Sequence, residues 1–276
     1  MFCQRARDSG QSDGDFMSVI RVALIQSELV WQDSLANQRS FEQQFRQHPG
    51  VQLFVLPEMF NSGFSMDSTR IAETMEGLTV QWMQQQAKLT GAALCGSVAI
   101  ADQGQIFNRL LFVTPDGVVQ FYDKRHLFRM GGEQQHYQAG SERVIVSYLG
   151  FRFCLQVCYD LRFPVFARNQ QDYDALIYVA NWPQPRRLVW RTLLQARAIE
   201  NQAYVLGCNR IGSDANSLNY SGDSLVVDYL GQICSELPVG QAGVLVAELD
   251  LDALQQFKQK FPAYLDADAF VLTPSF

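Results

Sequence analysis

Three side chains with complementary chemistry, Glu58, Lys124 and Cys158, each follow a short, mostly apolar run of the sequence. The three runs are residues 53–56, 118–122 and 151–157. Runs of this length and composition predict strands. A carboxylate, an ammonium group and a thiol at strand ends could supply a general base, an electrostatic stabiliser and a nucleophile. Their combination predicts nucleophilic catalysis at a shared site.

Each of the three features also has an ordinary structural explanation. Burial raises the pKa of a carboxylate and makes it a better base, but a lone Pro-Glu pair is typical of a solvated loop. Lys124 lies in a basic, aromatic stretch that by itself indicates a surface cluster. A thiol at a strand-to-helix junction can have its thiolate favoured by backbone N–H groups and a nearby cation. By default, however, a single cysteine is a small buried apolar residue.

The histidines favour a structural role over a catalytic one. His48, His126 and His136 are the only imidazoles, and none has the local signature of a cysteine protease. We interpret His126 as a hydrogen-bonded structural residue. A metal site built from Cys154, Cys158, His126 and His136 is a further hypothesis, although the Cys-x₃-Cys spacing lacks a second cysteine pair.

The elements expected around these residues alternate between strands and helices, which indicates a sheet covered by helices. Ser34 is expected to cap the first helix. The expected helices span residues 35–48, 79–89, 165–170 and 188–202. The expected strands outside hairpins span residues 19–25, 53–56, 92–100, 175–180, 203–208, 225–227, 232–236 and 244–249.

Two hairpins are expected in the middle of the chain. Residues 106–113 and 118–122 are joined by a Pro-Asp-Gly turn, and residues 144–149 and 151–157 meet at Gly150. The pattern predicts one mixed α/β domain over residues 17–276. Residues 1–16 are polar and rich in Gly, Ser, Asp and Arg, and we interpret them as a disordered extension or an added leader outside the fold.

Composition narrows the classes of function. The chain has 276 residues, of which 47% are hydrophobic and 18% charged, so it can bury a large core. A net charge of −6 argues against general nucleic-acid binding, which usually needs a basic face. The longest apolar runs fall far short of the roughly 20 residues of a membrane helix. Six scattered cysteines without a secretory segment predict reduced thiols and a cytoplasmic location.

Four motifs in this chain resemble those of the nitrilase superfamily of carbon–nitrogen hydrolases, in the same order. They are LPE at 56–58, YDKRHL at 122–127, CYDLRFP at 158–164 and QARAIENQ at 195–202. The resemblance implies that Glu58, Lys124 and Cys158 are catalytic. It also implies an oxyanion contact from the backbone N–H of Tyr159, and a second glutamate, Glu133, that positions the lysine and the substrate.

The same resemblance implies a four-layer α-β-β-α sandwich of the nitrilase type, which commonly dimerises through one helical layer. A homodimer is therefore expected, and Leu188, Leu193 and Leu194 are compatible with burial in such a layer. The resemblance implies a small-molecule amide as substrate and neither a metal nor an organic cofactor.

The tripeptide Asn181-Trp182-Pro183 resembles the ω-amidase branch of this superfamily. That branch hydrolyses the terminal amide of small 2-oxo dicarboxylic acid monoamides, such as 2-oxoglutaramate, to the acid and ammonia. The alternatives are another activity of the superfamily, namely a general aliphatic amidase, an N-carbamoyl hydrolase or a nitrilase. A catalytically inactive binding module on the same fold is a further alternative.

A 2-oxo acid substrate also needs a partner for its carboxylate. Arg129, Arg186 and Arg187 are the candidates, and the sequence does not choose among them. Phe64 and Trp182 are candidate apolar walls of the pocket, although either could equally belong to the core.

Overall fold

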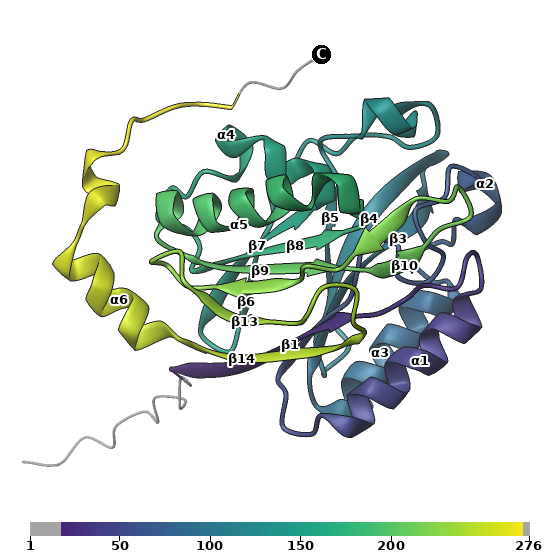
Figure 1. Cartoon of the computed structure of the whole chain (residues 1–276), viewed down its shortest axis with the longest axis horizontal. Helices are drawn as coiled ribbons and strands as arrows, with labels where there is room; N and C mark the ends of the chain where they lie inside the picture. The colour runs from purple at the N-terminus through teal and green to yellow at the C-terminus, as the bar shows by residue number, and fades with distance from the viewer. Residues whose placement is uncertain (1–17, 273–276) are drawn as a thin grey trace, which may run out of the picture.

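In the computed structural model, which describes residues 18–272, two six-stranded sheets pack against each other between layers of helices (Figure 1). The first sheet has the strand order β14-β1-β2-β3-β4-β5. Its strands are β1 (Val19–Gln26), β2 (Leu53–Val55), β3 (Ala93–Asp102), β4 (Gln105–Val113), β5 (Val119–Asp123) and β14 (Gly243–Asp250).

The second sheet has the order β13-β12-β9-β8-β7-β6. A separate two-stranded hairpin comes between β9 and β12 along the chain. The strands of the second sheet are β6 (Ile145–Tyr148), β7 (Phe151–Val157), β8 (Ala175–Ala180), β9 (Tyr204–Asn209), β12 (Leu225–Val227) and β13 (Ile233–Glu236). The hairpin consists of β10 (Ile211–Ser213) and β11 (Asn219–Ser221).

Helices cover the outer face of each sheet, which confirms the four-layer α-β-β-α sandwich. The α-helices are α1 (Ser34–Gln47), α2 (Ser68–Ile71), α3 (Leu78–Thr90), α4 (Pro164–Ala167), α5 (Arg187–Asn201) and α6 (Leu251–Lys260). The 3-10 helices are η1 (Arg129–Gly131), η2 (Glu133–Gln135), η3 (Cys158–Arg162), η4 (Gln184–Arg186) and η5 (Ala263–Asp266). Helices α1 and α3 lie side by side on the first sheet, and α5 lies on the second (Figure 1).

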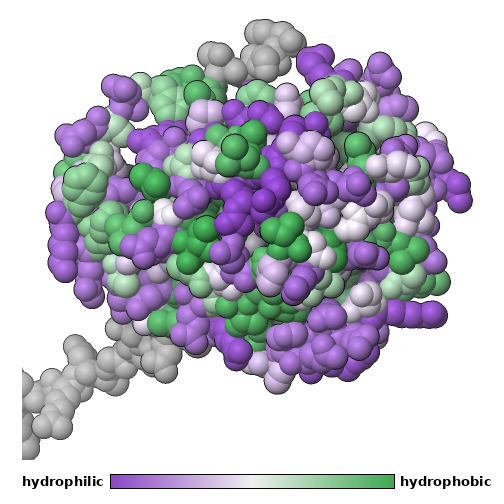
Figure 2. Space-filling model, viewed as in Figure 1, coloured by the Kyte–Doolittle hydropathy of each residue, from purple (hydrophilic) through white to green (hydrophobic). Residues whose placement is uncertain are grey.

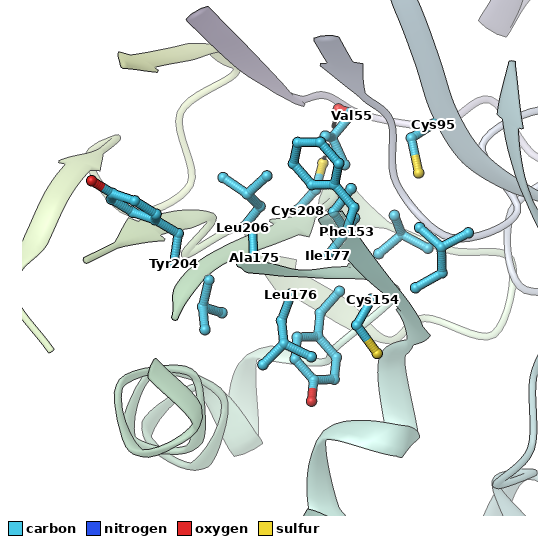
Figure 3. Packing of buried hydrophobic residues seen from close by; sticks show 14 of the residues in the cluster. Val55, Cys95, Phe153, Cys154, Ala175, Leu176, Ile177, Tyr204, Leu206 and Cys208 are labelled. Atoms are coloured by element: carbon cyan, nitrogen blue, oxygen red, sulfur yellow. Dashed lines mark hydrogen bonds between the residues drawn. The ribbon is translucent and has the colours of Figure 1, made fainter. Parts of the chain in front are cut away.

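The period-two alternation of the strands explains the layers. On β1, Val22 and Leu24 belong to the core between the sheets, whereas Ala23 and Ile25 pack with the α1 and α3 side. Figure 3 shows the same alternation in the second sheet, where Phe153 and Ile177 point toward Val55 of the first sheet. Both faces of the central strands are thus buried, which is why these strands read as continuous apolar runs.

Helix α5 packs directly on the second sheet. An ideal Cβ on Gly207 of β9 would lie 2.4 Å from Cδ1 of Leu194, so a larger residue there would force the Leu194 side chain to move. Leu194 is a core residue of its own chain and is not exposed on the surface of the helical layer. Leu188, in contrast, is 76% exposed on the same helix.

The local elements follow the sequence closely, with two corrections. Both expected hairpins form, as β4–β5 and β6–β7. The first helix is capped by Asp33, whose Oδ1 accepts the N–H of Ala36 at 3.0 Å, and Ser34 is already helical. The helix expected over residues 165–170 is the single turn α4, which is preceded by a 3-10 turn. The interpretation of residues 1–16 lies outside the described residues.

The surface is of mixed polarity on the face shown in Figure 2, where hydrophobic residues interrupt the hydrophilic surface in several separate places. Within residues 18–272, no helix combines the length and the apolar character needed to cross a membrane.

Candidate active site

Glu58, Lys124 and Cys158 come together at one cavity, which all three residues line. Glu58 lies just beyond β2, Lys124 directly follows β5, and Cys158 directly follows β7. The carboxylate and the ammonium group therefore come from the first sheet and the thiol from the second. The cavity has a volume of about 120 Å³, which suits a small substrate. The proximity that the proposed chemistry requires is present.

The carboxylate of Glu58 is fully buried and held on both oxygens. Its Oε1 accepts from Nζ of Lys124 and from Nδ2 of Asn108, each at 2.8 Å. Its Oε2 accepts the backbone N–H of Asn181 at 2.9 Å. The side-chain amide of Asn181 also donates to the backbone carbonyl of Glu58 at 2.6 Å. The strand ends of both sheets thus fix this carboxylate in one orientation.

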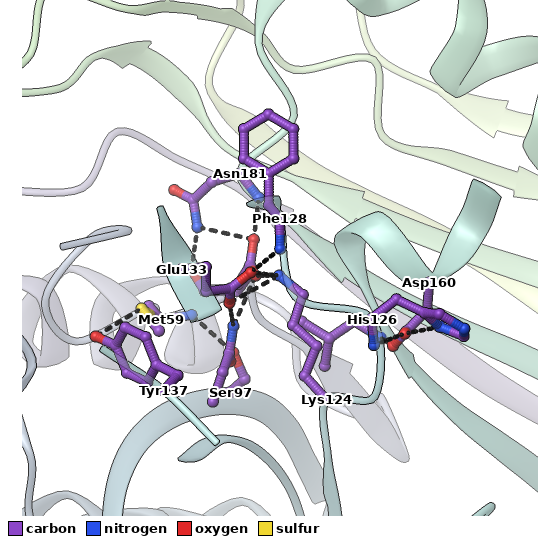
Figure 4. A network of polar contacts seen from close by, with 12 residues as sticks. Met59, Ser97, Lys124, His126, Phe128, Glu133, Tyr137, Asp160 and Asn181 are labelled. Carbon is purple, nitrogen blue, oxygen red and sulfur yellow. Dashed lines mark hydrogen bonds and ion pairs between the residues drawn. The ribbon is translucent and has the colours of Figure 1, made fainter. Parts of the chain in front are cut away.

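Lys124 is a buried cation between two carboxylates (Figure 4). Its Nζ donates to Glu58 at 2.8 Å and to the two oxygens of Glu133 at 3.0 and 2.9 Å. Burial lowers the pKa of Lys124, but attraction to Glu133 and Glu58 outweighs burial and raises the pKa above its usual value. The ring of Phe64 lies 5.2 Å from Nζ. Lys124 is therefore charged and can face a developing oxyanion.

Glu133 lies behind Lys124, as the resemblance implies, rather than on the cavity wall. It begins the 3-10 helix η2, and its Oε2 accepts the backbone N–H of Phe128 at 2.6 Å. Burial raises the pKa of Glu133, while Lys124 lowers it and Glu58 raises it further. The carboxylate anchors both the lysine and the loop that follows it.

Cys158 occupies a left-handed backbone position at the end of β7, with φ of 46°. This region is uncommon for a residue that has a side chain. Burial and the negative charge of Glu58 raise the pKa of the thiol well above its usual value, and Lys124 offsets only part of this effect. The stabilisation of the thiolate that such a junction can provide is therefore outweighed here. The raised pKa favours the protonated thiol, and the carboxylate of Glu58 lies beside it.

Asp160 ties the turn of the thiol to the loop of the lysine, a role that the sequence analysis missed. Its Oδ2 accepts from the hydroxyl of Tyr122 at 2.8 Å and from the backbone N–H of Val157 at 2.9 Å. Its Oδ1 accepts from the backbone N and from Nδ1 of His126, at 3.0 and 2.7 Å (Figure 4). His126 is thus a hydrogen-bonded histidine, and its ring stacks on Phe163.

Most of the predicted binding residues line the cavity. Phe64, Tyr159, Trp182 and Arg186 are on its wall. Arg129 is the exception, since its side chain is exposed on η1 and does not line the cavity. The loop turns this arginine outward while the neighbouring backbone binds Glu133.

Arg162 is a cavity residue that the sequence analysis did not single out. Its guanidinium carbon lies 5.2 Å from the ring centroid of Trp182, and that of Arg186 lies 5.3 Å from the centroid of Phe128. Within residues 18–272 neither arginine has an ion-pair partner, whereas Arg187 binds Asp223 at 2.6 Å. The available signal for Arg162 was its place in the CYDLRFP motif, four positions after the thiol.

The β10–β11 hairpin forms another part of the wall that no motif indicated. The hydroxyl of Tyr220 donates to Oδ2 of Asp214 at 2.9 Å. Oδ1 of Asp214 accepts the backbone N–H groups of Asn216 and Leu218, which closes the turn. All four of these residues line the cavity. Their types are common in loops, so only the fold could place them here.

The hypothetical metal site is not assembled. The part of the chain that the structure describes contains no group of three or more His, Cys, Asp or Glu side chains that could hold a metal ion. Cys154 lies in the apolar core (Figure 3), and the ring of His126 is bound to Asp160.

These features define a class: a four-layer α-β-β-α protein whose cavity gathers a thiol, a buried ammonium group and a buried carboxylate. The chain belongs to the carbon–nitrogen hydrolase family, which it matches over residues 21–259. It is therefore an enzyme of the carbon–nitrogen hydrolase type.

The chain is similar to proteins of known name and structure. It is 50% identical over 256 residues to Omega-amidase YafV of Escherichia coli (strain K12), which covers 93% of this chain and 100% of that protein. It is 32% identical to 2-oxoglutaramate amidase of Bacillus subtilis (strain 168), over 78% of this chain and 84% of that protein.

Among solved structures, the fold resembles a CN-hydrolase superfamily protein of Xanthomonas campestris that carries an arsenic adduct in its active site. The TM-score is 0.91 at 45% identity, covering 93% of this chain and all of that chain.

Proposed function

We propose that this protein hydrolyses the terminal amide of a small 2-oxo dicarboxylic acid monoamide, of the 2-oxoglutaramate kind, to the acid and ammonia. One observation carries the proposal: a thiol shares a cavity with a buried carboxylate–ammonium pair and with two arginines that lack carboxylate partners among the described residues. The similarity to proteins named as an omega-amidase and a 2-oxoglutaramate amidase supports the same substrate class.

In the first half of the reaction Cys158 is acylated. Glu58 takes the proton of the thiol as Sγ attacks the amide carbon, and the carbonyl oxygen becomes an oxyanion. Nζ of Lys124 and the backbone N–H of Tyr159 bind that oxyanion. The carbon–nitrogen bond then breaks, Glu58 passes its proton to the leaving nitrogen, and ammonia departs from a thioester. Losing one oxyanion donor typically slows such a step about 10²–10³-fold.

In the second half, water replaces ammonia. Glu58 takes a proton from the water as the water oxygen attacks the thioester carbon. Nζ of Lys124 and the backbone N–H of Tyr159 again bind the oxyanion that forms. The carbon–sulfur bond breaks, and Glu58 returns the proton to Sγ. The product acid leaves and the protein regains its starting protonation state. No step needs a group beyond the side chains, the substrate and water.

The substrate carboxylate is assigned to Arg162 and Arg186. A guanidinium group binds a carboxylate through two parallel N–H donors, and neither arginine uses those donors to bind a carboxylate of residues 18–272. Phe64 and Trp182 then supply apolar walls for the carbon chain.

A panel of amides tests the proposed substrate class. Ammonia release is measured from 2-oxoglutaramate, from the same acid without its 2-oxo group, and from pentanamide, with a nitrile and an N-carbamoyl compound alongside. We expect the highest kcat/KM for the 2-oxo acid. Equal rates on all amides would indicate a general amidase, and turnover of the nitrile or carbamoyl compound alone would indicate those activities. A chain inert on every compound would be a binding module.

The replacement Cys158→Ala serves as the control for chemistry at this cavity. We expect it to abolish ammonia release while circular dichroism stays unchanged. Turnover retained by this variant would reject Cys158 as the nucleophile.

We also propose that residues 17–276 act as one domain and that the protein is a cytoplasmic homodimer. Leu188 and Ile199 of α5 and Val165 of α4 are exposed apolar residues of one helical layer, which supports association through that layer. The five cysteines within the described residues are free thiols, which supports a reducing compartment. A monomeric mass by sedimentation, or recovery outside the cytoplasm, would contradict these assignments.

A further inference from the structure

Asn108 lies beneath the cavity, at a point where two buried negative charges meet. It belongs to β4, is fully buried, and is not part of the cavity wall. Its backbone carbonyl accepts the N–H of Lys124 at 3.0 Å. Its side-chain Nδ2 lies 2.8 Å from Oε1 of Glu58 and 3.2 Å from Oε1 of Glu133. One residue therefore contacts all three members of the charge cluster.

The cluster needs neutral donors as well as a cation. When ionised, Glu58 and Glu133 bring two negative charges to a site where Lys124 supplies one positive charge. Like charges in a low-dielectric interior repel strongly, and one route to relief is protonation of a carboxylate. An amide NH₂ has two hydrogens, so Asn108 can donate one to each carboxylate without adding charge.

The orientation of the Asn108 amide supports this role. Its Oδ1 is buried and has no hydrogen-bond partner among residues 18–272. A buried acceptor without a partner costs free energy. The reversed amide would instead point Oδ1 at two carboxylate oxygens, where repulsion would be larger. The amide is therefore oriented with both N–H groups toward the glutamates, although this leaves its own Oδ1 without a partner among residues 18–272.

We infer that Asn108 is a positioning residue that holds Glu58 and Glu133 together on Lys124 by donating one amide N–H to each carboxylate. This inference rests on the proposed function in one respect, namely that Glu58 takes the proton of Cys158. Aspartate at this position would add a third negative charge, and leucine would remove both donors while keeping the same branched shape.

The other titratable groups that face the two carboxylates are Lys124, Cys158 and Tyr137, from three different segments. Burial and the carboxylates raise the pKa of Tyr137 and of Cys158. The same carboxylates raise the pKa of Lys124 against the opposing effect of burial. Because the pKa of each of these three groups is raised, none of the three accounts for the acidic limb of a pH profile.

The experiment compares wild-type protein with Asn108→Leu and Asn108→Asp. Two quantities are followed against pH: kcat and KM for the best amide, and the rate at which iodoacetamide alkylates Cys158, read by mass spectrometry of its peptide. We expect both variants to move the acidic limb of both profiles upward by about one pH unit. We expect kcat to fall about ten- to a hundredfold and KM to change little, because Asn108 does not touch the substrate.

Asn37→Leu is the matched control, because Asn37 lies on α1 and is also buried, and its side-chain amide bonds only Val30 and Asn61 among residues 18–272. We expect it to lower stability without moving either limb. Profiles of the Asn108 variants that superpose on wild type would overturn the inference. Should Asn108→Leu not fold, the near-isosteric Asn108→Asp decides alone. The alkylation profile needs no substrate, so a chain inert on every amide would reject the proposed function while leaving this inference testable.

Discussion

At the scale of single residues, Arg162 and Arg186 distinguish this cavity from a purely apolar one. Both guanidinium groups lie near aromatic rings of the wall, 5.2 and 5.3 Å from the ring centroids, and neither has an ion-pair partner within residues 18–272. Arginine stays charged at every accessible pH, so its attraction for a carboxylate does not depend on pH. The contribution of the substrate carboxylate to binding can therefore be measured separately from the reaction at the thiol, by comparing charged and neutral amides.

Replacing Arg162 with methionine should affect only substrates that carry a carboxylate. We expect KM for 2-oxoglutaramate to rise about ten- to a hundredfold, the effect of losing a hydrogen bond to a charged group, with kcat changed less. The rate on pentanamide should stay within a factor of about three. Steady-state ammonia release measures both substrates.

Arg129→Met is the matched control for that substitution, since Arg129 is exposed and lies off the cavity wall. We expect wild-type kinetics from it. An equal rise in KM for the neutral amide in Arg162→Met would instead show that the side chain acts through packing.

At the scale of elements, the turn after β7 and the loop after β5 are joined by Asp160. This carboxylate accepts four hydrogen bonds, from Tyr122, Val157 and the backbone and ring of His126. Two of these donors flank Lys124 in sequence, and one immediately precedes Cys158. A displacement of either segment is therefore transmitted to the other, although Asp160 itself does not line the cavity.

Asp160→Asn should impair both stability and catalysis. An amide can accept on only one of its two polar atoms, so at least one donor pair loses its partner, and we expect a loss of about 1.5–3 kcal/mol of stability. Because the thiol and the lysine then lose their fixed separation, kcat should fall about tenfold or more. Urea denaturation and initial rates measure the two effects.

Asp174→Asn separates these two effects. Asp174 is also buried and bonds Arg152, but it lies at the start of β8, at the opposite end of that strand from Asn181. We expect lower stability with unchanged kcat. If the two variants lose activity in equal proportion, the special role of Asp160 is refuted.

The comparison of sequence with structure is also clearest at this scale. Glu58 and Cys158 could be placed at strand ends because the buried strands β2 and β7 are mostly apolar runs that stop near polar residues. Lys124 could be placed because a Pro-Asp-Gly turn marks the hairpin whose second strand, the partly exposed β5, it follows. Asp33 in place of Ser34 as the cap is a one-residue ambiguity between two good capping residues.

The contacts of Asp160 and the β10–β11 wall could not be derived from the sequence, because they depend on distances between segments far apart in the chain. The raised pKa of Cys158 could not be derived for the same reason, since the burial of the thiol and the nearness of Glu58 exist only in the folded state.

At the scale of the whole molecule, buried thiols make stability depend on pH. Burial raises the pKa of Cys154 to about 12 and raises those of Cys95, Cys158 and Cys208 as well. In the unfolded chain a thiol titrates near pH 8.5, at about its ordinary value. Since the folded pKa is the higher one, this stability is complete below about pH 8.5 and falls as the pH rises.

Cys154→Ala should reduce that loss. At pH 9.5 each buried thiol lowers the free energy of unfolding by about 1.4 kcal/mol relative to pH 7.5. Removing one such thiol should therefore reduce the loss between pH 7.5 and pH 9.5 by about that amount relative to wild type. Urea titrations at the two pH values measure it. The core truncation Val205→Ala, which removes no titrating group, should lower stability equally at both. An unchanged difference in Cys154→Ala would contradict the assignment.

The reaction centre also spans the two sheets, with Glu58 and Lys124 on one and Cys158 on the other. The five cysteines within residues 18–272 are free, so no disulfide among these residues fixes the spacing. The spacing is set by core packing, such as that of Val55 with Phe153 and Ile177, and by hydrogen bonds such as those from Asn181 to Glu58. A misplacement of about 1 Å can slow catalysis about a hundredfold. On gentle warming, a small shift of one sheet relative to the other would therefore lower the catalytic rate before the circular dichroism signal changes. The catalytic rate is then the more sensitive measure of how the two sheets are aligned.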